Sequence, residues 1–337
     1  MAGGGAVVPE PAVVRLAGTA ARSIIGGMIA WAFPGQGSQR ARMGALLPGF
    51  AALAEQAQRT TGVDLERLCV ADPQPAWTAD ELQQAIFVTT RAAAADARER
   101  AQEQARLPLP NAVVGHSLGE FAALVEARAL DYAAALQLVD VRGRAMAATG
   151  AERPGAMVAV VGLAHNAVAD TCATLGDVWV ANVNSPTQTV ISGAVADVQA
   201  AADCLNAAGA RMVVRLPISI ACHTPLMAPA AERLRAALDE IELQQPAIPF
   251  YSAVDAQPKQ HAADIAKALV DGVTRPVLFS ATVRRMRDDG VDGFVEVGPG
   301  RVLRSLLREN APELPRAAIA AYDETLTALR RAEPTGK

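Results

Sequence analysis

Ala112-Val-Val-Gly-His-Ser-Leu-Gly119 is the stretch that decides the predicted fold of this chain. Its apolar start is typical of a short buried strand, and a helical pattern begins directly after its second glycine. The turn between them fits G-x-S-x-G, in which a tight reversal lifts a serine hydroxyl clear of the backbone. Ser117 is therefore the candidate nucleophile. Because the start of the following helix favours negative charge, the N–H of Leu118 is a candidate donor to an oxyanion.

A second strand, loop and helix unit lies earlier in the chain. Ile29-Ala-Trp-Ala-Phe33 predicts a buried strand that ends at the glycine-rich turn Pro34-Gly-Gln-Gly-Ser38, and a helical stretch follows through about Gln58. Helical patterns recur from Asp80 to Gln104. Strands that alternate with helices favour a parallel sheet covered on both faces.

The pattern changes from Gly155 onward. Strand, helix, strand, strand, helix and strand follow in that order, which is typical of a ferredoxin-like module. The six segments are predicted at 156–161, 167–175, 178–183, 189–192, 196–208 and 211–216. The chain then passes His223 and continues with a predicted helix at 225–242 and predicted strands near 249–253 and 293–300.

The predicted fold class is α/β. We expect a large α/β-hydrolase-like domain with a parallel sheet, and an inserted small ferredoxin-like α+β subdomain. The expected boundaries are 28–150 and 218–320 for the large domain, 151–217 for the subdomain, 1–27 for a disordered extension and 321–337 for a C-terminal tail.

Composition excludes several classes of partner. Of the 337 residues 51% are hydrophobic and 20% charged, which is typical of a soluble globular protein. The net charge is −4 and the basic residues are scattered, so we expect neither a nucleic-acid nor a membrane partner. No apolar run approaches the roughly 18 residues of a membrane-spanning helix, and no secretory signal is evident. Four cysteines without metal-binding spacing fit a reduced cytoplasm, and we expect a monomer.

A serine hydroxyl needs a base within hydrogen-bond reach, and histidine is the usual one. Of the four histidines, His116 adjoins Ser117 and is expected to support the turn, while His165 and His261 lie in polar surroundings. His223 ends an extended segment just before a helix and is the preferred base. The alternative is a structural histidine at a strand end.

Six motifs follow one another along the chain between about Ile29 and Asn310. They are Phe33-Pro-Gly-Gln-Gly-Ser-Gln39, Gly115-His-Ser-Leu-Gly-Glu120, Val141-Arg-Gly-Arg-Ala-Met146, Asn184-Ser-Pro186, His223 with Leu226-Met227, and Glu296-Val-Gly-Pro-Gly300. In their residues and their order they resemble the malonyl-CoA:acyl carrier protein transacylase family.

The resemblance implies a ping-pong reaction with an acyl ester on Ser117. His223 would act first as base and then as acid, and the backbone N–H groups of Gln36 and Leu118 would hold the oxyanion. Malonyl-CoA and an acyl carrier protein would be the partners. The protein itself would bind no cofactor, because coenzyme A arrives as the substrate thioester and phosphopantetheine is carried by the acceptor.

By the same resemblance Arg142 pairs with the free carboxylate of the malonyl group, for which a planar guanidinium is suited. The alternative is a helix-surface arginine in a salt bridge, which is the expected state of Arg144. Further pocket residues implied by the resemblance are Gln84, His116, Met146, Asn184 and Gly272.

One position departs from the family pattern. Gly272 stands where the family has a glutamine whose main-chain carbonyl orients the histidine. Glycine keeps that carbonyl, so the Ser117 and His223 pair can survive, although a side-chain contribution is lost. No acidic third member is evident.

Two other classes of function compete. A thioesterase of the α/β-hydrolase type also uses G-x-S-x-G, but there the histidine comes near the C-terminus after an acid. A non-catalytic carrier-protein binding module with a decayed site is disfavoured because serine, histidine and arginine are all retained. Within the family, fatty acid, polyketide and malonate decarboxylase pathways all stay open. An acidic carrier protein would be steered by a basic rim, to which Arg284, Arg285, Arg287, Arg301 and Arg304 are candidate contributors.

Overall fold

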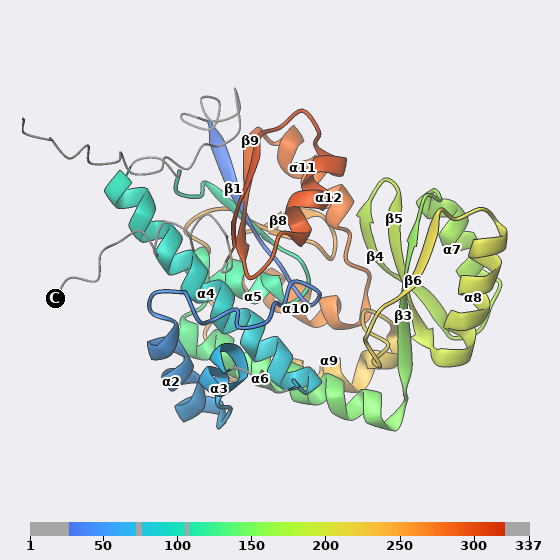
Figure 1. The fold of residues 1–337 in the computed structure, drawn as a ribbon, viewed down its shortest axis with the longest axis horizontal. Coiled ribbons are helices and arrows are strands. Elements are labelled where there is room, and N and C mark those ends of the chain that lie inside the picture. The colour runs from blue at the N-terminus through green and yellow to red at the C-terminus, as the bar shows by residue number, and fades with distance from the viewer. Residues whose placement is uncertain (1–26, 72–75, 105–107, 321–337) are drawn as a thin grey trace, which may run out of the picture.

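The computed structural model describes residues 27–71, 76–104 and 108–320. Two separate sheets organise this part of the chain (Figure 1). Gly27 apart, the predicted disordered extension lies outside the described residues, and so does the predicted C-terminal tail.

The larger sheet has six strands in the order β10-β9-β1-β2-β7-β8. All neighbouring strands pair in parallel except β8, which runs antiparallel to β7 at one edge. The fold is therefore of the predicted α/β class. The strands are β1 (Met28–Phe33), β2 (Ala112–Gly115), β7 (Phe250–Ser252), β8 (Gln257–Lys259), β9 (Val291–Gly298) and β10 (Arg316–Ala320).

The smaller sheet is antiparallel and has the order β4-β5-β3-β6. Its elements follow the predicted ferredoxin-like sequence of strand, helix, strand, strand, helix and strand. Figure 1 shows α7 and α8 on the side of this sheet that faces away from the large domain. The elements are β3 (Gly155–Val161), α7 (His165–Ala173), β4 (Val178–Ser185), β5 (Gln188–Ala194), α8 (Val195–Ala207) and β6 (Met212–Arg215).

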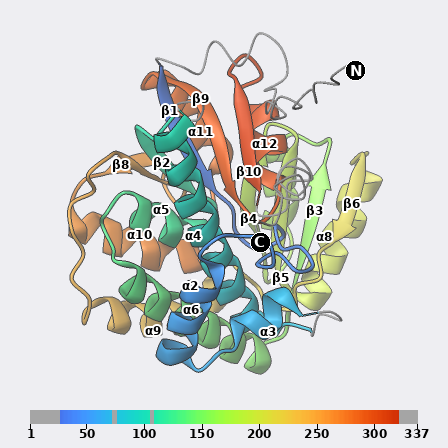
Figure 2. The ribbon, with the colours of Figure 1, turned by 60° about the vertical axis from the view of Figure 1, so that its left-hand side comes forward.

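Helices cover both faces of the larger sheet. Successive residues of β1 enter different apolar clusters, Trp31 and Phe33 on one face and Ala30 and Ala32 on the other. The first cluster packs against α4, α5 and α6, and the second against α11 and α12 (Figure 2). The helices of this domain are α2 (Phe50–Thr61), α3 (Leu65–Val70), α4 (Ala79–Gln104), α5 (Gly119–Glu126), α6 (Tyr132–Glu152), α9 (Ala228–Leu238), α10 (Ala262–Thr274), α11 (Phe279–Asp288) and α12 (Val302–Asn310).

Two helix predictions need correction. The first helix begins at Phe50, because Gly49 before it has a left-handed backbone (φ 72°) and the preceding residues form turns. The predicted helix 225–242 starts as a 3-10 turn over Pro225–Met227 and ends at Leu238.

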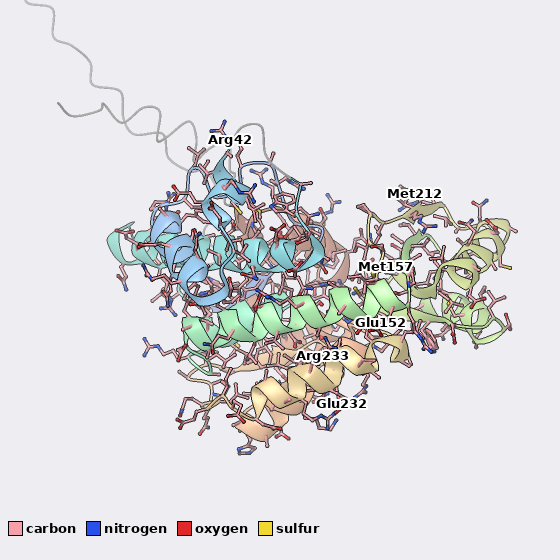
Figure 3. The ribbon with its side chains drawn as sticks, turned by 90° about the horizontal axis from the view of Figure 1, so that it is seen from below. Arg42, Glu152, Met157, Met212, Glu232 and Arg233 are labelled. Atoms are coloured by element: carbon pink, nitrogen blue, oxygen red, sulfur yellow. The ribbon has the colours of Figure 1, made fainter. Side chains whose placement is uncertain are left out.

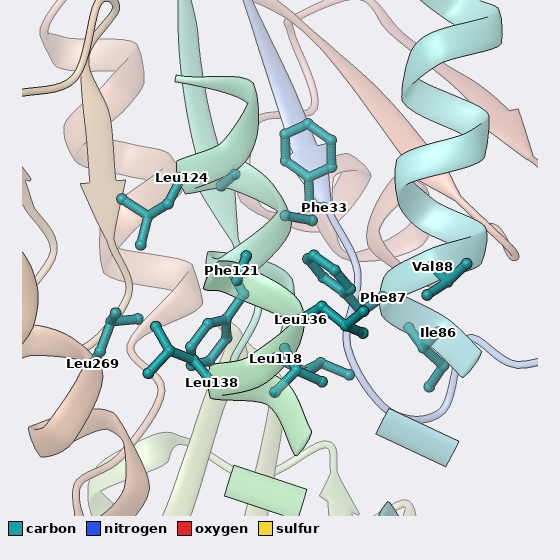
Figure 4. Close-up of a cluster of buried hydrophobic side chains, with 14 of the residues drawn as sticks. Phe33, Ile86, Phe87, Val88, Leu118, Phe121, Leu124, Leu136, Leu138 and Leu269 are labelled. Atoms are coloured by element: carbon teal, nitrogen blue, oxygen red, sulfur yellow. The ribbon is translucent and has the colours of Figure 1, made fainter. Parts of the chain in front are cut away.

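The core of the large domain extends beneath the predicted nucleophile. Phe33 of β1, Phe87 of α4 and Leu118 of the Ser117 turn belong to one buried cluster, shown in Figure 4. Burial of the side chains in this cluster holds the loops at the sheet edge in place.

Helix α6 lies along α9 and ends at Glu152, where the chain enters the small subdomain (Figure 3).

A buried carboxylate connects α4 to α5. The side chain of Glu126 is 0% exposed and accepts from Arg91 Nη1 at 2.9 Å and from Arg98 Nε at 2.6 Å. Because α5 directly follows the Ser117 turn, this pair of contacts braces the turn against the longest helix of the domain.

We expect Glu126→Ala to lower the free energy of unfolding by about 3 kcal/mol or more, because removing one partner leaves buried charge uncompensated. Urea unfolding measures the loss. Glu55→Ala, which breaks an exposed pair with Arg59, is the control and is expected to cost less than about 1 kcal/mol. Equal losses would show that the buried contacts do not brace the two helices.

Candidate active site

Two loops meet at the carboxyl edge of the larger sheet. Phe33 and Gly115 are register partners on the parallel strands β1 and β2, so the loops after both strands leave the sheet side by side. A Cβ on Gly119 would stand 2.0 Å from the Phe33 carbonyl oxygen. One on Gly35 would stand 2.5 Å from the His116 carbonyl oxygen. Glycine at these positions is what allows the two backbones to touch.

The turn that carries Ser117 is strained. Ser117 has a φ of 54°, in the left-handed region that residues with a side chain rarely adopt. The turn is held by the His116 N–H, which donates to the Phe33 carbonyl at 2.9 Å, and by the Gly119 N–H, which donates to the His116 carbonyl at 3.0 Å. Such strain is typical of functional sites, and here it presents the serine hydroxyl at the start of α5.

Ser117 and His223 come together although 106 positions separate them. Ser117 Oγ lies 2.9 Å from His223 Nε2, and His223 Nδ1 lies 2.7 Å from the Gly272 carbonyl oxygen. Because a carbonyl only accepts, Nδ1 carries the proton and Nε2 is left to accept the serine hydrogen. The Gly272 carbonyl belongs to the last turn of α10, where helix carbonyls lack intrahelical partners.

Burial keeps the His223 imidazole neutral. The pKa of His223 is lowered to about 3, first by removal from water and then by the positive charge of Arg142. His223 also has a left-handed backbone, with a φ of 62°. A neutral imidazole can accept a proton at physiological pH, as a general base must.

Arg142 lies beside the same hydroxyl. Its Nη2 donates to Ser117 Oγ at 3.0 Å, its Nη1 donates to the side-chain oxygen of Gln83, and its side chain is buried. Arg142 takes part in none of the ion pairs that the described residues form. Removal from water lowers the pKa of Arg142. Because none of these ion pairs includes it, the guanidinium remains available to a carboxylate from outside the chain.

Arg144 has the surface role that Arg142 lacks. Its Nε lies 2.7 Å from Asp140 Oδ1, one turn earlier on α6, and its side chain is 56% exposed. The salt bridge expected for Arg144 is therefore confirmed.

A pocket opens beside these groups. Its polar lining comes from Ser117, Glu120 and Arg142. Burial raises the pKa of Glu120 to about 7, while its Oε1 accepts from the Ser252 hydroxyl at 3.1 Å and the Ala253 N–H at 2.7 Å. The remaining lining residues are mostly apolar: Phe121, Ala253, Val254, Leu269, Gly272, Pro276 and Val277.

Of the other predicted pocket residues, only some lie at the pocket. Gly272 is among the residues that line it. His116 Nε2 lies 2.8 Å from Asn184 Oδ1, so these two residues join the serine turn to the end of β4 rather than line the pocket. Burial lowers the pKa of His116, which fits the supporting position expected of it.

The prediction for Gln84 needs correction. Its amide accepts from the Thr61 hydroxyl at 2.7 Å and donates to Asp140 at 2.7 Å, outside the pocket. The neighbouring Gln83 is the glutamine that contacts Arg142. Adjacent residues on a helix point in different directions, and both glutamines are buried, so the local pattern does not separate them.

Met146 is also not among the residues that line the pocket. It is buried and lies with its sulfur 3.9 Å from Gln83 Nε2.

Sequence reasoning missed Gln83 and Glu120 as site residues. Glu120 directly follows the G-x-S-x-G turn, and an acidic residue in the apolar first turn of a buried helix was the available signal.

The predicted oxyanion donors lie on the two touching loops. Gln36 belongs to the loop after β1, and the backbone N of Leu118 would be 3.6 Å from a Cβ on Gly35. Leu118 precedes the first residue of α5, where backbone N–H groups have no intrahelical acceptor. The positions suit an oxyanion hole, and that role stays a prediction.

Within the described residues no helix is both long and apolar enough to cross a bilayer.

Comparison with known proteins identifies one family. The acyl transferase domain family matches residues 30–331. A malonyl CoA-acyl carrier protein transacylase of Haemophilus influenzae is 37% identical over 294 residues, which are 85% of this chain and 93% of the relative.

Solved structures extend the likeness to the fold. A malonyl CoA-acyl carrier protein transacylase from Coxiella burnetii superposes with a TM-score of 0.82 at 32% identity, covering 90% of this chain and 98% of that one. A malonyl-transacylase in complex with its type II PKS acyl-carrier protein has a TM-score of 0.80 at 33% identity, covering 90% and 99%. With its fold, its serine turn and these similarities in agreement, the chain belongs to the acyl transferase domain family.

Proposed function

We propose that this protein transfers a malonyl group from malonyl-CoA to the phosphopantetheine thiol of an acyl carrier protein. The observation that carries the proposal is a buried arginine that forms no ion pair with a carboxylate of the described residues and lies 3.0 Å from a serine hydroxyl, which also faces a neutral imidazole. Such a site fits an acyl group with a free carboxylate. Relatives named malonyl CoA-acyl carrier protein transacylase, and a relative solved with its carrier protein, support the same assignment.

The first half of the reaction forms the acyl-enzyme. Ser117 Oγ attacks the thioester carbonyl carbon while its proton passes to His223 Nε2. The N–H groups of Gln36 and Leu118 stabilise the oxyanion. When the C–S bond breaks, the coenzyme A sulfur takes the proton back from His223, which leaves the malonyl ester on Ser117 and free coenzyme A.

The second half runs the same steps with another thiol. His223 Nε2 accepts the proton of the phosphopantetheine thiol, and the sulfur attacks the ester carbonyl. The C–O bond to Ser117 breaks, and the proton returns to Ser117 Oγ. Throughout, Arg142 holds the malonyl carboxylate, so the acyl group keeps its orientation between the two half-reactions.

A thioesterase with the same pair is the less favoured function. The histidine of this chain is oriented by a backbone carbonyl rather than an acid, and a long stretch of chain follows it, including α9 to α12. The relatives are transferases by name. Retention of Ser117, His223 and Arg142 within hydrogen-bond reach also disfavours a decayed binding module.

The proposal includes a cytoplasmic monomer that carries no cofactor of its own. The four cysteines, Cys69, Cys172, Cys204 and Cys222, are all unpaired, as suits a reducing compartment. The proposal also includes a basic rim that steers the carrier protein. Arg301 and Arg304 lie at the start of α12, and Gly300 before them lies against Ser38 of the loop after β1, so these two of the expected contributors are placed beside that loop.

The function is tested by incubating the protein with malonyl-CoA and holo acyl carrier protein. We expect malonyl-carrier protein to form with the wild type and not with Ser117→Ala, because the ester intermediate is lost. Without carrier protein, coenzyme A release should stop after about one equivalent per enzyme. Continued release at the same rate without any thiol acceptor would identify a hydrolase instead.

Arg142→Ala is expected to lower kcat/KM for malonyl-CoA at least about 30-fold, because a buried hydrogen-bonded ion pair with the substrate is lost. The value for acetyl-CoA, which has no carboxylate, should hold or rise. Arg144→Ala, two residues away and exposed, is the matched control and should change neither value. Unchanged discrimination between the two donors in Arg142→Ala would contradict the assignment.

The pH dependence of kcat/KM reports the free enzyme. Because the pKa of His223 is lowered to about 3, activity with acetyl-CoA should show no acid limb at the ordinary histidine value of 6.5. Removing the cation in Arg142→Ala should move the limb to higher pH. Glu120→Gln is the control for a second titrating group in the pocket. The pKa of Glu120 is raised to about 7, so its titration would add a step near that pH, and this variant removes the step.

Folding must be followed by circular dichroism across the same range. The unfolded chain takes up the His223 proton at about 6.5 and the folded chain at about 3, so this group makes the protein less stable as pH falls through that window. An acid limb at 6.5 in both folded proteins would show that Arg142 does not act on His223.

A further inference from the structure

Gly272 has no local reason to be glycine. It lies in the last turn of α10, where glycine is less favourable than alanine by up to about 1 kcal/mol. Glycine is usually required where φ is positive or where another backbone comes close. A Cβ on Gly272 would meet nothing within 4 Å, so no neighbour forbids a side chain.

The comparison with the other described glycines isolates this position. Six of them have open space where a Cβ would stand, and five of the six have φ between +72° and +98°, which explains them. Gly272 alone among the six has a backbone conformation that any residue adopts. The six are Gly37, Gly49, Gly62, Gly209, Gly272 and Gly290.

The open space lies at a residue that lines the pocket of the reacting groups. Gly272 lines the same pocket as Ser117 and Arg142. Its carbonyl binds one nitrogen of the His223 ring while the other nitrogen faces Ser117 Oγ, so one imidazole ring separates Gly272 from the nucleophile. The pocket residues that flank it in the chain, Leu269 and Pro276 with Val277, are apolar.

We infer that the absent side chain at Gly272 admits an alkyl substituent on C2 of the acyl group, so that the protein also accepts 2-alkylmalonyl thioesters such as methylmalonyl-CoA. The inference rests on the proposed function. C2 lies between the carbonyl that Ser117 attacks and the carboxylate that Arg142 holds, so a substituent there leaves both ends of the acyl group unchanged. An apolar wall favours an alkyl substituent over a polar one.

A second use of the space would be passage of the pantetheine arm. The two uses differ in a measurable way, because malonyl-CoA and methylmalonyl-CoA carry the same arm and differ only at C2. Filling the space should slow both donors equally if it holds the arm, and methylmalonyl-CoA selectively if it holds the C2 substituent.

The experiment measures kcat/KM for acylation by malonyl-CoA and by methylmalonyl-CoA in wild type, Gly272→Ala and Gly272→Gln. We expect the wild type to use both donors. Because the Gly272 carbonyl also orients His223, the readout is the ratio of the two values: Gly272→Ala should lower the methylmalonyl-CoA value relative to the malonyl-CoA value about 10-fold or more, the usual effect of one carbon in an apolar pocket. Gly272→Gln should extend the selective loss.

Ala263→Gly, in the exposed first turn of the same helix, alters helix propensity without lining the pocket and should leave the ratio of the two values unchanged. Wild type that takes malonyl but no methylmalonyl, or variants that lose both donors in parallel, would overturn the inference alone. Wild type that is acylated by neither donor would instead overturn the proposed function.

Discussion

The contact between the backbone of the serine turn and the loop after β1 is the constraint on which the site depends. Side chains at Gly35 or Gly119 would collide with main-chain atoms of the opposite loop, so glycine at both positions lets the loops meet. The contact places Ser117 in a left-handed conformation and sets the predicted oxyanion donors on adjoining loops. The apolar core beneath Leu118 and the Glu126 contacts between α4 and α5 stabilise this arrangement from below.

Electrostatics then connects the three groups around the hydroxyl. Removal from water and the nearby Arg142 cation both lower the pKa of His223, which keeps the imidazole neutral and able to accept a proton. A bound malonyl carboxylate would offset the Arg142 charge and so raise the basicity of His223. Arg142 would then do more than recognise the acyl group, because its pairing with the substrate would strengthen the base that acts on that substrate.

Local patterns were sufficient for the strand, turn and helix at Ser117 and for the order of elements in the small subdomain. His223 was selected because a serine nucleophile needs a base and the other three histidines suited that role less, whereas Arg142 followed from resemblance. No local pattern predicts the contact of Ser117 with His223 across 106 positions. Gln83 was missed because the rotation of α4 about its axis is set by tertiary packing. The hydrogen bonds that Glu120 accepts come from Ser252 and Ala253, far along the chain, so sequence gave no sign of them.

The central claim is that the Ser117 hydroxyl takes up a carboxylated acyl group and holds it as an ester. Intact-mass analysis after mixing with malonyl-CoA, followed by peptide mapping, measures this most directly. The account predicts a mass increase of one malonyl group, located on the peptide that contains Ser117. No increase, or an increase that maps to another residue and persists in Ser117→Ala, would contradict the account.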